Sequence, residues 1–217
     1  MPNSQSPPPP PDHTVAPGDQ EGLDAENQRA VSLMLRVKQG DHAAFAELVE
    51  THQHLVVHTA ARMLGNLDDG HDIAQQVFLR VWKSAPRYEP SAKFSTWLFT
   101  ILRNLVFNET RRRKRRRETT LEDGATQGGL HETLPDTAAL SPDAALADLE
   151  LQNALDKAIA ALPENQRLAV ILRRYEEMPY EQICDILKLS LPALKSMLFR
   201  ARAQLRRDLE AHLRGQA

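Results

Sequence analysis

The sequence has a single cysteine and no long hydrophobic run, and each of these two shortages excludes a class of protein. Cys184 alone cannot form an internal disulfide or a cysteine-rich metal site, which fits the reducing cytoplasm. No apolar stretch reaches the roughly 20 residues that a helix needs to span a bilayer, so we predict no membrane insertion. The N-terminus is polar and proline-rich, whereas a signal peptide has a basic start followed by an apolar stretch.

Lysine and arginine are absent from two acidic segments. Residues 1–27 hold five Asp or Glu and residues 118–150 hold eight, with no Lys or Arg in either. The remaining residues, 28–117 and 151–217, therefore contain 16 acids and all 27 bases. Their formal charge is +11, although the formal net charge of the whole chain is -2. A basic surface binds polyanions because it releases counterions from phosphates, so this distribution favours a nucleic-acid partner.

Composition divides the chain into two modules. The acidic segment 1–27 includes five consecutive prolines, and we predict that it is a disordered tail. Residues 118–144 are rich in glycine, threonine and acids, which predicts a flexible acidic linker. The modules are then residues 28–117 and 145–212. Apolar residues recur at helical spacing in both, and no alternating pattern indicates a strand, so we predict an all-α fold of two small helical domains.

Caps and apolar spacing predict four helices in the first module. Gly40 ends the first helix, and Asp41 is an N-cap for the second, which stops at Gly65. Apolar residues every four positions from Ile73 predict the third helix. Ser95 is expected to cap the fourth.

The second module ends in a predicted helix-turn-helix. Its last two helices are joined by three residues, of which Lys188 takes the place of the usual turn glycine and Ser190 caps the following helix. In such a motif the second helix enters the major groove, and here it carries Lys195, Arg200 and Arg202. The alternative is an ordinary helical hairpin with a basic solvent-exposed face.

Seven consecutive cations, Arg111 to Arg117, continue the fourth helix of the first module. Such a run repels itself, so it is either a solvated tail or a polyanion contact. The same helix carries Phe94, Trp97 and Phe99. Single-stranded nucleic acid needs this combination, because bases stack on rings while phosphates need cations. The alternatives are a nuclear localisation signal for the run and hydrophobic core for the rings.

Two parts of the chain resemble conserved regions of bacterial sigma factors. Two stretches resemble the second conserved region, DIAQQVFLRVW from Asp72 and FSTWLFTILRN from Phe94. Four short stretches between residues 161 and 202 are similar to the fourth region. They are ALPE from Ala161, YEQI from Tyr180, LKS from Leu194 and RAR from Arg200. Both regions, in this order and with only a short linker between them, resemble the extracytoplasmic-function group. The resemblance covers about residues 30–117 and 145–210.

This resemblance implies a sigma factor that binds the beta and beta-prime subunits of core RNA polymerase, directs it to promoter DNA and promotes strand opening. It implies no catalysis, cofactor or metal, and the group suggests an anti-sigma factor as a further partner. The polymerase contacts that it implies are Asp72, Gln75, Gln76, Phe78 and Trp82. The alternative for Phe78 and Trp82 is hydrophobic core.

The resemblance also implies two sets of DNA contacts. The loop from Arg87 to Phe94 would hold a flipped base of the non-template strand. The full minus-ten set is Arg87, Tyr88, Lys93, Phe94, Trp97, Arg103, Asn104, Asn108, Arg111 and Arg112. The minus-thirty-five set is Ser190, Ala193, Lys195, Ser196, Phe199, Arg200 and Arg202.

Several residues depart from the family pattern. Gln76 stands where an acid is usual, and Gly70 with His71 where Ala-Glu is usual. In the recognition helix, Pro192-Ala193 replaces Gly-Thr, and Met197 replaces a common Arg. Each change alters a candidate contact with the polymerase or the promoter.

Two other functions compete with this interpretation. A stand-alone helix-turn-helix regulator would explain residues 163–210 but leaves 72–104 without a role. A nucleic-acid-processing enzyme would need a cluster of acids or metal ligands. His52, His54 and His58 lie close in sequence, and the last two have metal-binding spacing, yet no carboxylate or cysteine completes the set.

Overall fold

The computed structural model describes residues 17–122 and 142–215, and within them it contains helices and no strand. This confirms the predicted all-α class. The elements of the first module are α1 (Pro17–Lys38), α2 (His42–Leu64), α3 (Leu67–Ser84), the short 3-10 helix η1 (Ala85–Arg87) and α4 (Phe94–Glu122). Those of the second module are α5 (Pro142–Ala161), α6 (Glu164–Arg174), α7 (Tyr180–Leu187) and α8 (Leu191–Gly215).

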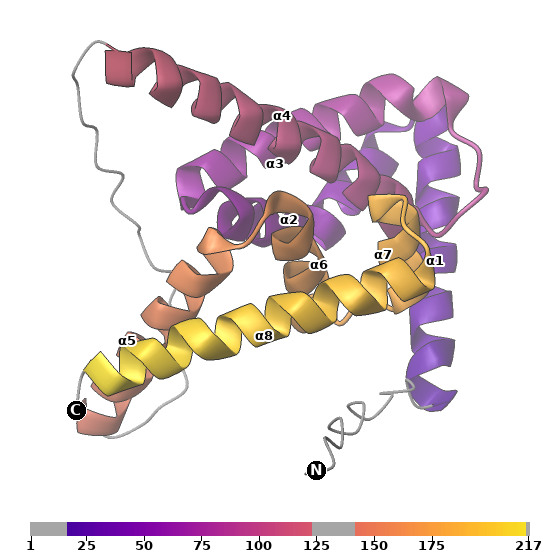
Figure 1. Cartoon of the computed structure of the whole chain (residues 1–217). Helices are drawn as coiled ribbons and strands as arrows, with labels where there is room; N and C mark the ends of the chain where they lie inside the picture. Colours follow the sequence, from indigo (N-terminus) through magenta and orange to yellow (C-terminus); the bar gives the residue numbers. More distant parts are fainter. Residues whose placement is uncertain (1–16, 123–141, 216–217) are drawn as a thin grey trace.

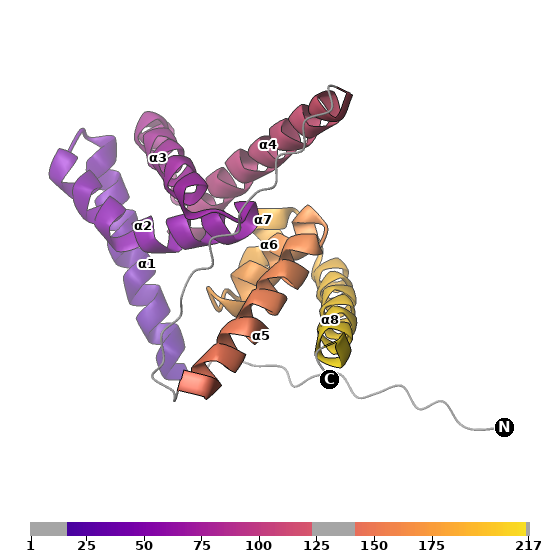
Figure 2. The same ribbon diagram turned by 90° about the vertical axis from the view of Figure 1, so that its left-hand side faces the viewer.

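The two modules pack against each other. Figures 1 and 2 show α6 and α7 lying beside α2 and α4, while α8 runs along the outer side of the second module. Buried side chains form one hydrophobic core that continues from the first module into the second. The sequence indicates two modules but not this contact between them.

Capping residues set the ends of the helices in the first module. Asp41 accepts a hydrogen bond from the Ala44 amide at 3.0 Å and begins α2, and Gly65 ends this helix in a left-handed conformation with φ 78°. Both predictions are confirmed. Asn66 accepts a bond from the Asp69 amide at 3.1 Å and so begins α3 directly after the stop.

Several predicted boundaries differ from those observed. The disordered tail is predicted to extend to residue 27, but α1 begins at Pro17, because proline suits a first helical turn where its missing N–H has no partner. The linker predicted over 118–144 overlaps the end of α4 and the start of α5. Residues 1–16 and 123–141, the rest of the tail and linker, lie outside the described residues.

The predicted cap of α4 is wrong. The helix begins at Phe94, one residue before Ser95, and the Phe94 amide donates to the Asn27 side chain of α1 at 2.8 Å. The Ser95 hydroxyl donates instead to Gln182 of α7 at 3.1 Å. A local pattern cannot reveal a cap that comes from a distant helix.

Helix α3 crosses α2 at close range through Gly70, which is buried. A Cβ atom at this position would lie 2.7 Å from the Val57 carbonyl oxygen and 2.9 Å from the Ala61 Cβ. The departure from the family pattern at Gly70 therefore has a packing reason, because a methyl group would force the helices apart.

The helix-turn-helix forms as predicted. Lys188 ends α7 in the left-handed conformation with φ 55° and ψ 50°, which a glycine would adopt more easily. The Ser190 hydroxyl accepts a hydrogen bond from the Ala193 amide at 3.4 Å at the start of α8. Pro179 occupies the N-cap position of α7, which begins at Tyr180.

Polar contacts join the two modules around one carboxyl group. The Thr59 hydroxyl of α2 donates to the Glu176 carboxylate at 2.9 Å. The Arg62 guanidinium lies 3.9 Å from the centre of the Tyr175 ring, and Arg167 donates to the carbonyl of Met63 at 2.8 Å. Burial raises the pKa of Glu176 above its usual value, since the charged carboxylate is poorly solvated there.

Candidate nucleic-acid interface

The α3–α4 loop (residues 85–93) encloses an open hollow beside the start of α4. Its volume is about 450 Å³. The hollow brings together residues from α3, the loop and α4, which are Lys83, Ser84, Arg87, Tyr88, Glu89, Ser91 and Trp97. Three of the predicted minus-ten residues, Arg87, Tyr88 and Trp97, therefore meet at one cavity.

Aromatic rings form one wall of this hollow. The Tyr88 and Trp97 rings meet edge to face at 5.0 Å, and Trp97 lies 5.8 Å from Phe94. Tyr88 and Phe94 are buried, whereas Trp97 is partly exposed. The Tyr88 hydroxyl is buried without a hydrogen-bond partner in the described part of the chain, and burial raises its pKa. The partly exposed Trp97 ring is therefore the ring face that the wall offers to the hollow.

One face of α4 leads away from the hollow. Trp97, Asn104, Asn108 and Arg111 are spaced by seven, four and three residues, so they lie along the same side of the helix. Asn104, Asn108 and Arg111 are exposed. The structure therefore brings these four predicted residues into a single stripe that carries an aromatic ring, two amides and a cation.

Arg103 does not belong to this stripe. It shares a different face of α4 with Thr96, Phe99 and Phe107, at spacings of three and four residues. The Thr96 hydroxyl contacts Gln182 of α7 at 3.4 Å, so this face turns toward the second module. The Arg103 guanidinium lies 5.3 Å from the centre of the Phe107 ring. Lys93 is partly buried at the end of the α3–α4 loop.

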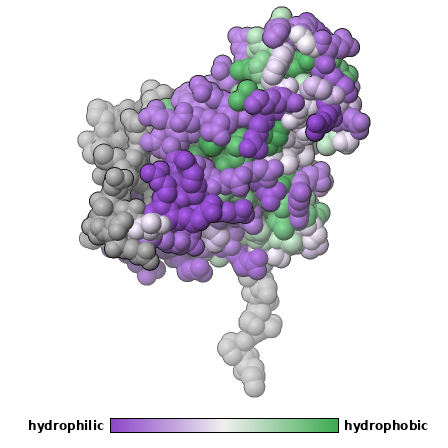
Figure 3. Space-filling view, turned by 90° about the horizontal axis from the view of Figure 1, so that it is seen from above, coloured by the Kyte–Doolittle hydropathy of each residue, from purple (hydrophilic) through white to green (hydrophobic). Residues whose placement is uncertain are grey.

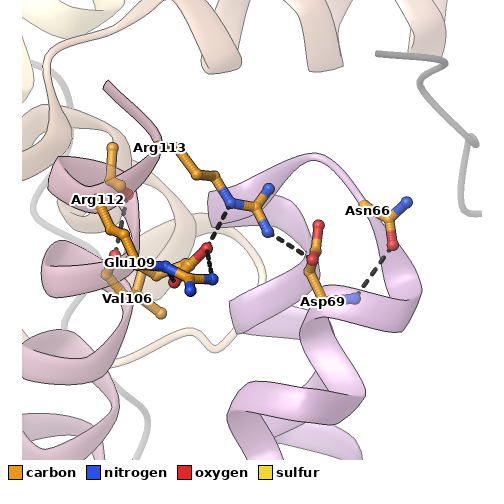
Figure 4. Close-up of polar contacts among 7 residues, drawn as sticks. Asn66, Asp69, Val106, Glu109, Arg112 and Arg113 are labelled. Carbon is orange, nitrogen blue, oxygen red and sulfur yellow. Dashed lines mark hydrogen bonds and ion pairs between the residues drawn. The ribbon is translucent and has the colours of Figure 1, made fainter. Parts of the chain in front are cut away.

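Part of the cationic run is neutralised within the protein. Figure 4 shows Arg113 reaching from α4 to α3, where it pairs with Asp69 at 2.5 Å as well as with Glu109 at 2.8 Å. Arg112 pairs with the same Glu109 at 2.7 Å, and this pairing lowers the pKa of the Glu109 carboxyl. Arg111 makes no ion pair among the described residues, so it is the better candidate for a phosphate contact.

The predicted polymerase contacts divide into exposed and buried residues. Asp72, Gln75 and Gln76 are exposed on α3, whereas Phe78 is only 7% exposed and belongs to the hydrophobic core. Leu79, which the sequence analysis did not include, is 52% exposed at the next position of the same face. The spacing 72, 75, 76 and 79 would have revealed it.

The second aromatic residue of this set packs inside the first module. Trp82 is partly buried, its ring stacking on His42 at 4.8 Å and meeting Phe45 of α2 edge to face at 5.0 Å.

Figure 3 views the molecule from above, onto α3 and α4, and shows a mostly hydrophilic face with a hydrophobic patch in its middle. An apolar patch with a polar surround is typical of a transient protein interface.

Helix α8 presents the predicted minus-thirty-five residues on its outer side. Ser196, Phe199 and Arg200 occupy one exposed face, and Lys195 and Arg202 flank it. Phe199 is 66% exposed, more than any other large hydrophobic residue described. An exposed ring next to cations is suited to contact with a base edge, because apolar groups recognise the thymine methyl.

Three other residues of α8 and its turn serve the fold. The Ser190 hydroxyl caps the helix, and Ala193, whose amide it binds, is partly buried. Met197 packs against the hydrophobic core of the second module, so the family's usual arginine is replaced here by a residue that faces inward. The predicted set also omits Arg207, which is exposed two turns after Arg200 on the same face. The seven-residue spacing between these two arginines is the signal that would have added it.

No group of three or more His, Cys, Asp or Glu within residues 17–122 and 142–215 is placed to hold a metal ion. The His54 and His58 rings lie 4.3 Å apart, while His52 is buried, bonds the Leu48 carbonyl at 2.9 Å and meets Phe94 edge to face. Burial lowers the pKa of His52 and His58, which favours their neutral forms.

Within residues 17–122 and 142–215, none of the helices combines the length and the apolar character that a membrane crossing requires.

Two protein families match the chain in separate segments. The family described as Sigma-70 region 2 matches residues 48–116, and the family described as Sigma-70, region 4 matches residues 152–205. The first match contains the hollow and the exposed stripe of α4, and the second contains the helix-turn-helix.

Relatives of known name align over most of their length. The ECF RNA polymerase sigma factor SigW of Bacillus subtilis is 31% identical over 80% of this chain and 93% of its own length. The RNA polymerase sigma-H factor of Pseudomonas aeruginosa is 31% identical over 84% of this chain and 94% of its own length.

Solved structures are similar in fold. The sigma factor RpoE of Bartonella quintana, solved in complex with the anti-sigma factor NepR, matches with a TM-score of 0.61 and 25% identity over 76% of this chain and 96% of its own. CnrH, solved with the cytosolic domain of CnrY, matches with a TM-score of 0.60 and 23% identity over 84% of this chain and 98% of its own. The chain belongs to the sigma-70 family of RNA polymerase sigma factors, and within it to the extracytoplasmic-function group.

Proposed function

We propose that this sigma factor opens promoter DNA by capturing an unstacked base of the non-template strand in the hollow of the α3–α4 loop. The observation that carries this proposal is the aromatic wall that Tyr88 and Trp97 form at the hollow, with the buried Phe94 ring packed against Trp97. A base that leaves the duplex loses its stacking, and a ring face replaces it. Binding alone therefore shifts the equilibrium toward the open strand, and no bond is made or broken.

The exposed stripe of α4 then holds the strand beyond the captured base. Asn104 and Asn108 present amides that donate to and accept from base edges, and Arg111 supplies a cation for a phosphate. Arg103 lies on the face that turns toward α7, so we leave it out of the strand contact while the modules are packed.

Helix α8 recognises the upstream element as duplex DNA. Its exposed face carries Ser196, Phe199 and Arg200, which reach into the major groove, while Lys195 and Arg202, seven residues apart and so on one side of this face, contact the phosphates there. The basis for this assignment is the position of α8 on the outside of the second module, where a duplex can approach it (Figure 2).

The partners follow from these surfaces and from the relatives. The exposed face of α3, with Asp72, Gln75, Gln76 and Leu79, is the proposed docking surface for core RNA polymerase. An anti-sigma factor is a second proposed partner, since RpoE of Bartonella quintana was solved with one. The protein acts in the cytoplasm, where bacterial core polymerase and the genome are found.

Run-off transcription with purified core polymerase on a library of genomic fragments tests the function. We expect protein-dependent transcripts from discrete sites, which also establish the promoter sequence. Permanganate footprinting then detects unpaired thymines, and Asn104→Ala should reduce their number because the separated strand loses an amide contact. Arg29→Ala serves as control, because Arg29 pairs with Glu47 of α2 and not with the loop. Duplex binding without any association with core polymerase would instead favour a stand-alone regulator.

A further inference from the structure

Helix α1 holds both ends of the α3–α4 loop through two polar side chains. The Lys38 ammonium at the end of α1 donates to the Tyr88 carbonyl at 2.9 Å. Three turns earlier, the Asn27 side chain accepts the amide hydrogen of Phe94 at 2.8 Å. The segment from Tyr88 to Phe94 is therefore tied at its two ends to one rigid helix, and we call this pair of contacts the α1 brace.

The contact at Phe94 replaces a missing helix cap. The first amides of a helix have no partner within it and are usually satisfied by the side chain just before the helix. Lys93 occupies that place and carries no acceptor, and the hydroxyl of Ser95 is directed to Gln182. Phe94 is fully buried, so water cannot easily satisfy its amide. Asn27 therefore determines where α4 starts.

The contact at Tyr88 holds the other end of the loop, where the Tyr88 ring lines the hollow. Tyr88 and Trp97 both line the cavity, and their rings touch at 5.0 Å. A lysine on α1 that holds the Tyr88 carbonyl also sets the direction in which this ring leaves the backbone. Tyr88 and Phe94 thus reach their positions through backbone atoms that α1 holds.

We propose that Asn27 and Lys38 are positioning residues that preorganise the hollow for base capture, and this rests on the proposed function of the hollow. A binding loop that is held in its bound shape loses less conformational entropy when the ligand arrives. Both residues lie outside the segment 48–116 that matches the Sigma-70 region 2 family, so the α1 brace is a property of the chain beyond the matched domain.

Single-strand binding by the full-length protein tests the proposal. The probe is an oligonucleotide with the minus-ten sequence found by run-off transcription, carrying each of the four bases in turn at every position. Wild-type protein should prefer one base at the captured position. Lys38→Met and Asn27→Ala should each weaken binding of the preferred strand about 5- to 10-fold and flatten this preference, because the loop then has to be ordered on binding.

Matched variants separate positioning from general stability. Arg29→Met removes a polar contact of α1 with Glu47 but touches no part of the loop, so base preference should remain. Lys38→Arg keeps a donor and should recover most of the preference. Thermal melting and binding of the minus-thirty-five duplex by α8 should be unchanged in Lys38→Met, because Lys38 is an exposed side chain.

The outcomes are distinct for the two proposals. A wild-type protein that binds the single strand without any base preference would overturn the proposed function of the hollow. A wild-type preference that survives unchanged in both Lys38→Met and Asn27→Ala would overturn the α1 brace alone. The α1 brace is also rejected if both variants lose duplex and single-strand binding to the same extent.

Discussion

The two modules offer DNA surfaces of opposite shape. The first module presents a hollow of about 450 Å³ with an aromatic wall that is mostly buried. The second presents the convex outer face of α8, whose side chains are exposed and have few contacts with the protein. The shape follows from the state of the DNA, because a duplex supplies its own groove whereas an unstacked base needs a cavity built by the protein.

The two DNA surfaces also differ in how many other parts of the fold each one requires. The hollow requires backbone atoms from α1, the α3–α4 loop and α4 to be held together. The face of α8 requires only that the helix exists and that its inner side packs through residues such as Leu194 and Leu198. Mutations that loosen the fold should therefore impair strand capture before they impair duplex binding.

The largest expected effect is that of Trp97→Ala. Removing a ring on which a base stacks costs about 1–3 kcal/mol, so binding of the single-stranded minus-ten oligonucleotide should weaken by roughly 5- to 150-fold. Binding of the minus-thirty-five duplex should stay unchanged, because α8 lies in the other module. Fluorescence anisotropy with both oligonucleotides measures the two effects side by side.

The control for this variant is Trp97→Phe, which keeps a ring and should retain most of the affinity. A thermal melt detects unfolding of the first module, which is a risk because Trp97 also packs against Phe94 and Tyr88. Equal losses on both oligonucleotides in a folded protein would break the comparison between the modules.

A smaller effect is expected from Arg200→Ala, with the opposite selectivity. Loss of this groove contact should weaken duplex binding by about 1 kcal/mol, and removal of one cation from the interface should reduce the salt dependence of binding. Single-strand binding should not change. Asp208→Ala, a substitution of an exposed acid further along α8, is the control for helix integrity. An Arg200→Ala variant that binds the duplex as tightly as the wild-type protein would remove this residue from the proposed groove contacts.

The smallest expected effect concerns the contact that joins the modules. Burial raises the pKa of Glu176, although Thr59 and Arg62 favour its charged form, so the packed arrangement binds a proton more readily than the separated one. Protonation therefore stabilises the contact in acid, and this contribution is lost as the pH rises through the raised pKa. Glu176→Gln should keep the modules packed at every pH, because an uncharged amide carries no desolvation penalty of this size.

Energy transfer between two labels measures this change. The labels are placed on cysteines introduced at the exposed positions Gln53 and Asp208, with Cys184 replaced by serine. Transfer should decrease as the pH rises through the raised pKa of Glu176 in the wild-type background and stay constant in Glu176→Gln. A pH profile that is the same in both proteins would show that Glu176 does not control the contact.

Local patterns were sufficient to predict most of the helices and several of their ends. Asp41, Gly65 and Ser190 act at the positions expected of them, since a cap is decided by the residue and its nearest neighbours. The start of α4 was misplaced because its cap, Asn27, is 67 residues away in sequence. The burial of Phe78 and the exposure of Leu79 could not be predicted for a similar reason, since only the packing of α3 on α2 decides which of two adjacent apolar residues is buried.

The all-α class, the helix-turn-helix and the family follow from the order of residues alone, because periodicity, caps and family motifs are properties of short segments. Tertiary packing was needed to reveal that Arg112 and Arg113 are paired within the protein while Arg111 is not, and that Arg103 faces away from the exposed stripe of α4. The hollow and the contact between the modules likewise emerge only in three dimensions. These features depend on atoms from segments far apart in the chain, and their distances are set by the burial of a common core rather than by any local preference.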